Sequence, residues 1–278
     1  MPRSTPAPLS ASRTALINGL RKSAPQIVLD DKGYTTDIGA NLLEGVRLSD
    51  FEADLRQGDG NELEGKFRAA HSSSALAVNS FAPFKVAPEA LWLPGNQGFS
   101  SLCFERKCPH GLAGRRSPNL DVFADGSAGI VAIESKCLET MTPHVANFAP
   151  AYDAEIRDSR RATPWFRKMQ VLSENPRLYR WLDAAQLVKH AFGIAYSFPD
   201  QPTTLLYLYW EPTNPDEYPF FREHRDEVAR FASSIAGSAP AFAAMSYPQL
   251  WRHWSLNAEW GWLRAHIDRL NVRYGVAV

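Results

Sequence analysis

The segment SPNLDVFADGSAGIVAIESKCLE, residues 117–139, is strongly apolar, yet its strand-like runs carry Asp121, Glu134 and Lys136. Because side chains alternate along a strand, Glu134 and Lys136 project from one face of the GIVAIESKC run. If the NLDVFA run pairs with it across a turn near Gly126, Asp121 falls roughly opposite Glu134, with β-carbons about 4.5 to 5.5 Å apart. Two carboxylates this close raise each other's pKa unless a positive charge lies between them.

A divalent cation would remove that repulsion. Mg²⁺ takes oxygen ligands, commonly one or two carboxylates with waters and phosphate oxygens. With Mg²⁺ or Mn²⁺ held by Asp121 and Glu134, the site could polarise a phosphodiester and bind the attacking water. Lys136 would orient or deprotonate that water, or stabilise the charge that develops on phosphorus. The alternative interpretation is an ordinary cross-strand ion pair at a sheet edge.

Apolar runs between Pro and Gly punctuation predict the strands that must position these charges. Segments 99–107, 119–124 and 129–137 form an expected three-stranded meander, with Asp125-Gly126 as a turn signal. The run TTLLYLYWEP, residues 203–212, is apolar on both faces like a central strand. A short further strand is expected over 241–247.

Helical periodicity predicts helices that start near Asn61 and at Asn175-Pro176, and others over about 219–235, 247–255 and 259–274. Strands bracketed by helices indicate an α/β fold, with a mixed central sheet flanked by helices on both faces. Residues 1–10 are expected to be a disordered lead-in. Residues 11–278 are long enough for a single domain with a substantial core.

The spelling Pro118-Asn119-Leu120-Asp121, twelve residues, then Glu134-Ser135-Lys136 resembles the PD-(D/E)XK nuclease superfamily, to which many restriction endonucleases belong. Pro118 departs from the usual pattern, because it lies three residues before the aspartate and not next to it. The stretches SSSALAVNSFAPF and LDVFADGSAGIVAIESKCLE also resemble a bacterial family of restriction-endonuclease-like proteins. The resemblance implies a restriction-endonuclease-like fold and a metal-dependent endonuclease that cuts DNA.

The resemblance also implies residues outside the central hairpin. Superfamily members often carry a glutamate on the helix before the hairpin, and either Glu62 or Glu64 would fill that position; Glu62 would assist catalysis through a metal-bound water. Polar residues on the helix after the hairpin, here Gln186 and Lys189, would contact the scissile phosphate. The simpler interpretations are a surface ion pair between Glu62 and Lys66, and an exposed helix face for Gln186 and Lys189.

Four further charged residues lie near these positions in the sequence. Arg115 and Arg116, just before the aspartate strand, suit a phosphate-backbone contact, although such a pair also serves solubility. Glu105 would supply another carboxylate or belong to a solvated strand edge. Glu139 is expected to support the site only indirectly.

Composition limits the partners and the compartment. Lys plus Arg equals Asp plus Glu at 30 each, so a polyanion such as DNA must be bound by a local basic patch. No segment reaches the roughly 20 apolar residues of a membrane span, and we expect a cytoplasmic protein with no membrane partner. Three cysteines are few and odd in number, which indicates free thiols in a reducing compartment. Cys103, Cys108 and His110 match no standard zinc-site spacing, so we expect packed thiols there.

Several alternatives stay open at this level. The C-terminal tryptophans could stack on bases, although their helical spacing is more typical of a core. A catalytically silent nucleic-acid-binding or accessory protein with the same fold competes with the nuclease, as does a hydrolase of another kind that uses a carboxylate pair on non-nucleic substrates. DNA is not distinguished from RNA, and a homodimer is compatible with the resemblance but shows no interface pattern.

Overall fold

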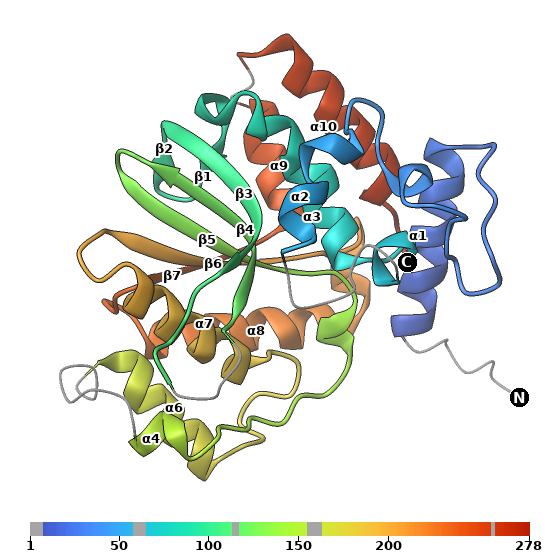
Figure 1. Ribbon diagram of the computed structural model, residues 1–278. Helices are drawn as coiled ribbons and strands as arrows, with labels where there is room; N and C mark the ends of the chain where they lie inside the picture. Colours follow the sequence, from blue (N-terminus) through green and yellow to red (C-terminus); the bar gives the residue numbers. More distant parts are fainter. Residues whose placement is uncertain (1–7, 58–64, 113–116, 155–162, 257–258) are drawn as a thin grey trace, which may run out of the picture.

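A central sheet organises the protein. The computed structural model describes residues 8–57, 65–112, 117–154, 163–256 and 259–278 (Figure 1). Its five-stranded sheet has the order β3-β4-β5-β6-β7, in which β3, β4 and β5 form an antiparallel meander and β6 and β7 run parallel to β5. The strands are β3 Phe99–Lys107, β4 Asn119–Gly126, β5 Gly129–Lys136, β6 Thr203–Tyr209 and β7 Ala241–Ser246. The predicted mixed sheet, its meander and its central apolar strand β6 are confirmed.

Helices and short turns surround this sheet. The helices are α1 Pro8–Ser23, α2 Glu52–Leu55, α3 Ser73–Phe81, α4 Ala151–Ala154, α6 Pro164–Glu174, α7 Ala184–Ser197, α8 Pro219–Ser234, α9 Tyr247–Leu256 and α10 Gly261–Tyr274. Single 3₁₀ turns are η1 Gly39–Asn41, η2 Leu48–Asp50, η3 Lys66–Arg68, η4 Ala82–Lys85, η5 Pro88–Ala90, η6 Glu139–Met141 and η7 Pro215–Glu217. A small hairpin pairs β1 Trp92–Leu93 with β2 Asn96–Gln97.

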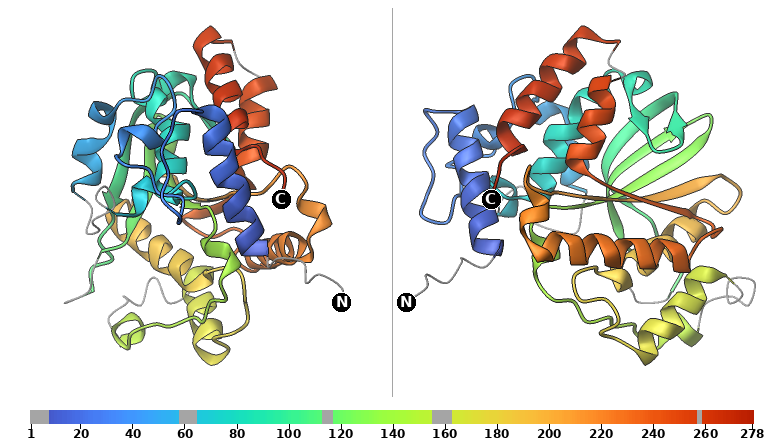
Figure 2. Two further views of the ribbon diagram at one scale, coloured as in Figure 1. Left: turned by 90° about the vertical axis from the view of Figure 1, so that its right-hand side faces the viewer. Right: turned by 180° about the vertical axis from the view of Figure 1, so that it is seen from behind.

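Helices cover both faces of the sheet (Figure 2). On β5, Ile130 and Ala132 pack into one apolar cluster with residues of α6, α7 and α8. Val131 and Ile133 point the other way, into a second cluster with α3, α9 and α10. The period-two alternation of an apolar strand therefore builds two cores at once, as the sequence pattern predicts. Trp251 and Trp254 are buried in the second cluster, which confirms the core interpretation of these tryptophans.

The segment that the sequence predicts as a helix from about Asn61 onward is not helical between residues 65 and 72 apart from one 3₁₀ turn. Residues 58–64, including Asn61, lie outside the described residues, and the chain then forms the turn η3 before α3 starts at Ser73. The amide of Asn41 donates to the carbonyls of Phe67 and Ala69, at 2.7 and 2.9 Å, and holds this segment out of a helix. The Ser72 side chain then accepts from the Ala75 N–H at 3.2 Å and starts α3.

The helix predicted from Asn175-Pro176 is also shorter at its start, because α7 begins at Ala184. A buried carboxylate on α8 explains the difference. Glu227 accepts the backbone N–H groups of residues 180, 181 and 182 at 2.8 to 3.0 Å, so these amides are bonded without a helix. Asp183 then accepts from the Gln186 N–H at 3.0 Å and caps the true N-terminus.

The N-terminal region differs from its prediction as well. Helix α1 begins at Pro8, so residues 8–10 of the expected disordered lead-in are helical, while residues 1–7 lie outside the described part.

Helix α6 was not predicted from the sequence. Within the described ranges, no helix combines the length and the apolar character needed to cross a membrane.

One buried arginine joins the N-terminal region to α10. Arg273, 1% exposed, donates from Nη1 to the Leu16 carbonyl at 3.1 Å. Its Nη2 reaches the Asn41 side chain at 3.1 Å and the Ala70 carbonyl at 2.8 Å. Because Leu16 belongs to α1, Asn41 to η1 and Ala70 lies shortly before α3, this one guanidinium holds three separate parts of the chain to α10.

A buried carboxyl after β6 makes the stability depend on pH. Burial raises the pKa of Glu211 to about 7, and Arg225, with Nε 3.6 Å away, only partly opposes the shift. The neutral carboxyl therefore favours the folded state below its ordinary pKa of 4.5, and this contribution is lost as the pH rises through about 7.

We expect a Glu211→Gln variant to gain stability relative to the native protein as the pH rises, because glutamine never ionises inside the fold. Thermal unfolding at pH 5.5 and 8.5 measures the effect as a difference in Tm that is more positive at the higher pH. The exposed Asp226→Asn substitution on the same helix as Arg225 is the control. A Tm difference for Glu211→Gln that stays constant between the two pH values would contradict the prediction.

Candidate active site

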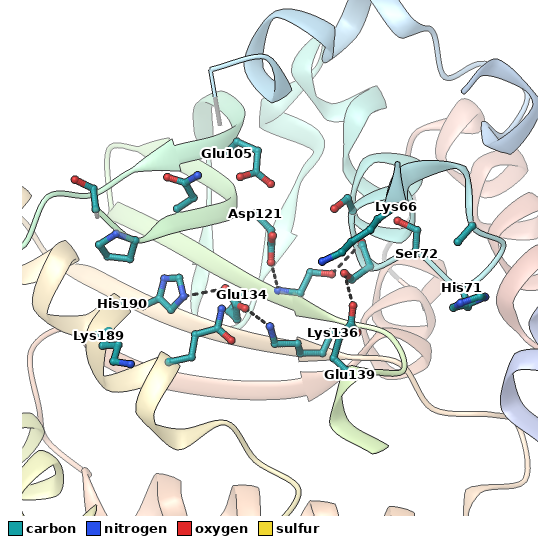
Figure 3. A pocket seen from close by; sticks show the side chains of 18 of the residues that line it. Lys66, His71, Ser72, Glu105, Asp121, Glu134, Lys136, Glu139, Lys189 and His190 are labelled. Atoms are coloured by element: carbon teal, nitrogen blue, oxygen red, sulfur yellow. Dashed lines mark hydrogen bonds and ion pairs between the residues drawn. The ribbon is translucent and has the colours of Figure 1, made fainter. Parts of the chain in front are cut away.

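The β4–β5 hairpin brings the two predicted carboxylates together. Its pairs run from Gly126 opposite Gly129 to Val122 opposite Ile133. One step further along the same register lie Asp121 and Glu134, the arrangement that alternation and the turn signal predict. The Asp121 Oδ2 atom accepts the Ser135 backbone N–H at 2.6 Å, so the carboxylate is fixed against β5 (Figure 3).

A third carboxylate lies across from Asp121 on β3. Phe104 pairs with Val122 and Arg106 pairs with Leu120, which places Glu105 opposite Asp121. Glu105 has φ +50°, in the left-handed region that residues other than glycine seldom adopt. Strained backbone of this kind concentrates at functional sites, where the surrounding structure holds it. Figure 3 shows the Glu105 side chain beside Asp121 at the same end of the sheet.

The position of Asp121 is electrostatically unfavourable for a charged carboxylate. Burial raises the pKa of Asp121 well above its ordinary value, and the nearby Glu134 and Glu105 raise it further. Lys136 and the Ser135 N–H oppose the shift without reversing it. The structure therefore concentrates negative charge in a place where a cation would be stabilised.

Glu134 is held from both sides. The side chain is almost fully buried, with 2% of the residue exposed. Its Oε1 lies 2.5 Å from the Lys136 Nζ, and its Oε2 lies 3.2 Å from the His190 Nε2. Burial acts to lower the pKa of Lys136, but the Glu134, Asp121 and Glu139 carboxylates outweigh it and raise the pKa above its ordinary value. Burial lowers the pKa of His190, against the opposing effect of Glu134.

Glu139 ties the end of β5 to the start of α3. Its two carboxylate oxygens accept from the Ser73 hydroxyl and from the Cys137 N–H, each at 2.7 Å. The Ser135 hydroxyl lies 2.7 Å from the Tyr247 hydroxyl on α9, and so connects the strand to a second helix of the layer that contains α3. These contacts make Glu139 a support for the strand end that carries Lys136.

These side chains line one pocket of about 670 Å³, here called the central pocket. Strands β3, β4 and β5 contribute Glu105, Asn119, Asp121, Glu134, Ser135 and Lys136. A second wall comes from α7 and its neighbours, with Tyr152, Gln186, Lys189 and His190. A third wall comes from the N-terminal region and the start of α3, with Tyr34, Lys66, His71, Ser72, Ser73 and Ser74.

Among the residues predicted from sequence, the pocket brings together Asp121, Glu134, Lys136, Gln186 and Lys189. The Lys189 ammonium lies 5.4 Å above the Phe148 ring, and burial lowers the pKa of this lysine. The other predicted residues, Glu62, Glu64, Arg115 and Arg116, lie outside the described residues. Two cysteines were considered as zinc ligands. Cys108 is buried and Cys103 is half-buried, and both are free thiols.

Sequence reasoning missed His190 and the third wall. His190 follows Gln186 by four residues on the helix, so helical spacing alone places both on the same face and could have indicated the histidine. No comparable signal marks Tyr34, Lys66 or His71. They reach the pocket through tertiary contacts, among them the bonds of Arg273 and Asn41 to the carbonyls of Ala70 and Ala69.

The donor set suits a cation that keeps part of its water shell. Within the described ranges, no group of three or more His, Cys, Asp or Glu side chains is arranged to enclose a metal ion. The site instead offers the Asp121 and Glu134 carboxylates beside an open pocket. Mg²⁺ commonly binds in this way, through one or two carboxylates while waters and phosphate oxygens complete its shell. The unrelieved repulsion around Asp121 fits such a cation.

Comparison with known proteins gives one relationship. Searches of curated proteins and of solved structures found no match to the chain. One family model, described as "Restriction Endonuclease associating with ARP", matches residues 19–275 and therefore covers the sheet, both helix layers and every wall of the central pocket. The chain accordingly belongs to this restriction-endonuclease family.

Proposed function

We propose that the protein is a metal-dependent deoxyribonuclease that hydrolyses phosphodiester bonds of DNA with Mg²⁺ or Mn²⁺. The observation that carries this proposal is the placement of Asp121, Glu134 and Lys136 at one strand end in a polar pocket. The family to which the chain belongs favours a nuclease over other uses of a carboxylate pair.

Asp121 and Glu134 would hold the metal ion. When bound, the ion supplies Lewis-acid polarisation of the phosphate and lowers the pKa of water. The ammonium of Lys136 lies in the same pocket and stabilises the negative charge that develops on the phosphoryl oxygens. Gln186 and Lys189 extend from the second wall to bind the oxygens of the scissile phosphate.

The remaining predicted residues keep their proposed roles. Glu62 would assist the hydrolysis, with Glu64 as the alternative, and Arg115 and Arg116 would contact the DNA backbone. Lys66 adds a potential cation on the third wall, opposite α7. A chain of zero net charge can attract a polyanion only through such a local concentration of positive groups.

The decisive experiment incubates the protein with plasmid DNA, methylated and unmethylated, in Mg²⁺, Mn²⁺ or EDTA. We expect nicked or linear DNA with either metal and none with EDTA. Lys136→Ala should reduce cleavage by roughly 10²- to 10³-fold, because a preorganised charge next to the reacting phosphate is lost. Circular dichroism checks that this variant is folded, and the exposed Lys32→Ala serves as the matched lysine control. Cleavage by Lys136→Ala at the native rate would contradict the proposal.

A second candidate function is a catalytically silent nucleic-acid-binding or accessory protein with the same fold. One observation favours it: both oxygens of Glu134 are already engaged, by Lys136 and by His190. DNA binding that needs no metal, together with no nicking under any divalent ion, would support this candidate over the nuclease.

A further inference from the structure

His190 occupies an unusual position beside the proposed metal ligands. It lies on α7 and is 2% exposed, with its Nε2 at 3.2 Å from the Glu134 Oε2. Its Nδ1 atom is buried without a hydrogen-bond partner in the described part of the chain. Figure 3 shows the ring reaching from the helix toward Glu134, on the side away from Lys136.

The chemistry of the two groups fixes the direction of this contact. An ionised carboxylate only accepts hydrogen bonds, so the Nε2 of His190 must carry the proton and donate it. In a neutral imidazole the other nitrogen then has a lone pair and no proton. That assignment agrees with an Nδ1 that has no acceptor within reach.

The hydrogen bond that His190 donates completes the positioning of the Glu134 carboxylate. Lys136 holds Oε1 from β5 itself, and His190 holds Oε2 from α7. Because a carboxylate offers about four lone-pair sites, one bond to each oxygen still leaves each oxygen able to ligate a cation. A carboxylate fixed at both oxygens loses little freedom when it binds a metal.

We propose that His190 is a positioning residue, whose Nε2–H holds the Glu134 carboxylate in the orientation that takes a divalent cation. The inference rests on the proposed function, since it deepens the account of the same site. Its physical basis is that hydrogen-bonded partners of metal ligands orient them, and their removal typically lowers metal affinity by about 10- to 100-fold.

The same contact links the metal ligands to the second wall. Helix α7 belongs to the crossover between the parallel strands β5 and β6 and packs on the β4–β5 hairpin through apolar side chains. His190 shares a helix face with Gln186 and lies next to Lys189. The His190–Glu134 contact therefore adds a polar link between the helix that carries the proposed phosphate-binding side chains and the strand that carries a proposed metal ligand.

The test measures Mn²⁺ binding to the full chain by isothermal titration calorimetry. His190→Ala should weaken Mn²⁺ binding by about 10- to 100-fold. His190→Gln should recover most of the affinity, because its amide nitrogen lies near the position of Nε2. His190→Asn should not, because its shorter amide matches the position of Nδ1. His266→Gln removes another buried histidine, on α10, and should leave Mn²⁺ affinity unchanged.

Thermal unfolding of every variant separates positioning from folding. If His190→Ala does not fold, the comparison of His190→Gln with His190→Asn carries the test. Native Mn²⁺ affinity in His190→Ala, or an equal loss in the Gln and Asn variants at equal stability, overturns the inference.

The outcomes also distinguish this inference from the nuclease proposal. DNA cleavage by the native protein, with unchanged Mn²⁺ affinity in His190→Ala, overturns the role of His190 and leaves the nuclease standing. Mn²⁺ binding that depends on His190, without DNA cleavage, does the reverse. A native protein that binds no Mn²⁺ overturns both.

Discussion

An Asp121→Asn variant is expected to lose DNA cleavage by roughly a thousandfold or more and, at the same time, to become more stable than the native protein. The activity is lost because an amide replaces one of two anionic ligands at the reacting phosphate, where preorganised electrostatics make the largest contribution. The stability rises because burial and the nearby carboxylates of Glu134 and Glu105 make a charged Asp121 unfavourable in the folded state.

The pH dependence of this gain has a definite sign. The folded-state pKa of Asp121 is raised, so the native protein loses stability as the pH rises above the ordinary value of 3.8. The advantage of Asp121→Asn should therefore grow as the pH rises from 4, and reach roughly 2 °C or more in Tm. It should shrink as the pH falls toward 4, where Asp121 takes up its proton in both states.

Thermal unfolding and plasmid cleavage measure the two effects on one preparation. Asp125→Asn, on the same strand but next to the hairpin turn, is the matched control and should change neither quantity strongly. A variant that loses activity and also stability would contradict the electrostatic account, because it would show that the carboxylate is needed for folding.

The largest effect on stability is expected from Arg273→Ala, with a loss of about 3 kcal/mol or more in the free energy of unfolding. The substitution removes a donor group from three buried acceptors, and each unsatisfied buried acceptor costs about 1 to 3 kcal/mol. Arg273→Met should lose nearly as much, since it fills the volume without donating. Arg273→Lys should lie between, because an ammonium cannot span acceptors as a planar guanidinium does.

Urea unfolding measures these free energies, and hydrogen exchange locates the change. Faster exchange is expected first in α1, whose carbonyl at Leu16 loses its donor. The nearby Arg269→Ala is the control, because Arg269 pairs with Glu44 at the surface, at 3.1 Å, and such pairs contribute at most about 1 kcal/mol. Equal losses in the Arg273 and Arg269 variants would contradict this interpretation.

The sheet and the central hairpin could be predicted because their signals are local. Alternation along β5 and the turn signal beside Gly126 fix the register, and the register places Asp121 next to Glu134. The positions of these residues follow from adjacent segments, whereas their roles in metal binding and catalysis stay predictions until they are measured.

The errors come from contacts between segments distant in sequence. Asn175-Pro176 resembles a helix start, but Glu227, more than forty residues away, bonds the amides that follow and delays α7 to Ala184. The left-handed backbone of Glu105 likewise has no signature in the residue itself, because residues other than glycine seldom adopt it. A sequence pattern indicates hydrogen bonds between residues that are close in the chain. The start of α7 depends instead on hydrogen bonds to a residue far along the chain.

The role of Arg273 also has a consequence for the order of events during synthesis on the ribosome. Its acceptor on Ala70 lies 203 residues earlier in the chain, directly before the pocket-lining His71 and Ser72. A nascent chain that has released only its first two hundred residues holds the acidic hairpin but lacks the anchor for the third wall. Domains fold as units as they emerge, so the nascent protein would carry its acidic groups before the walls of the central pocket are complete.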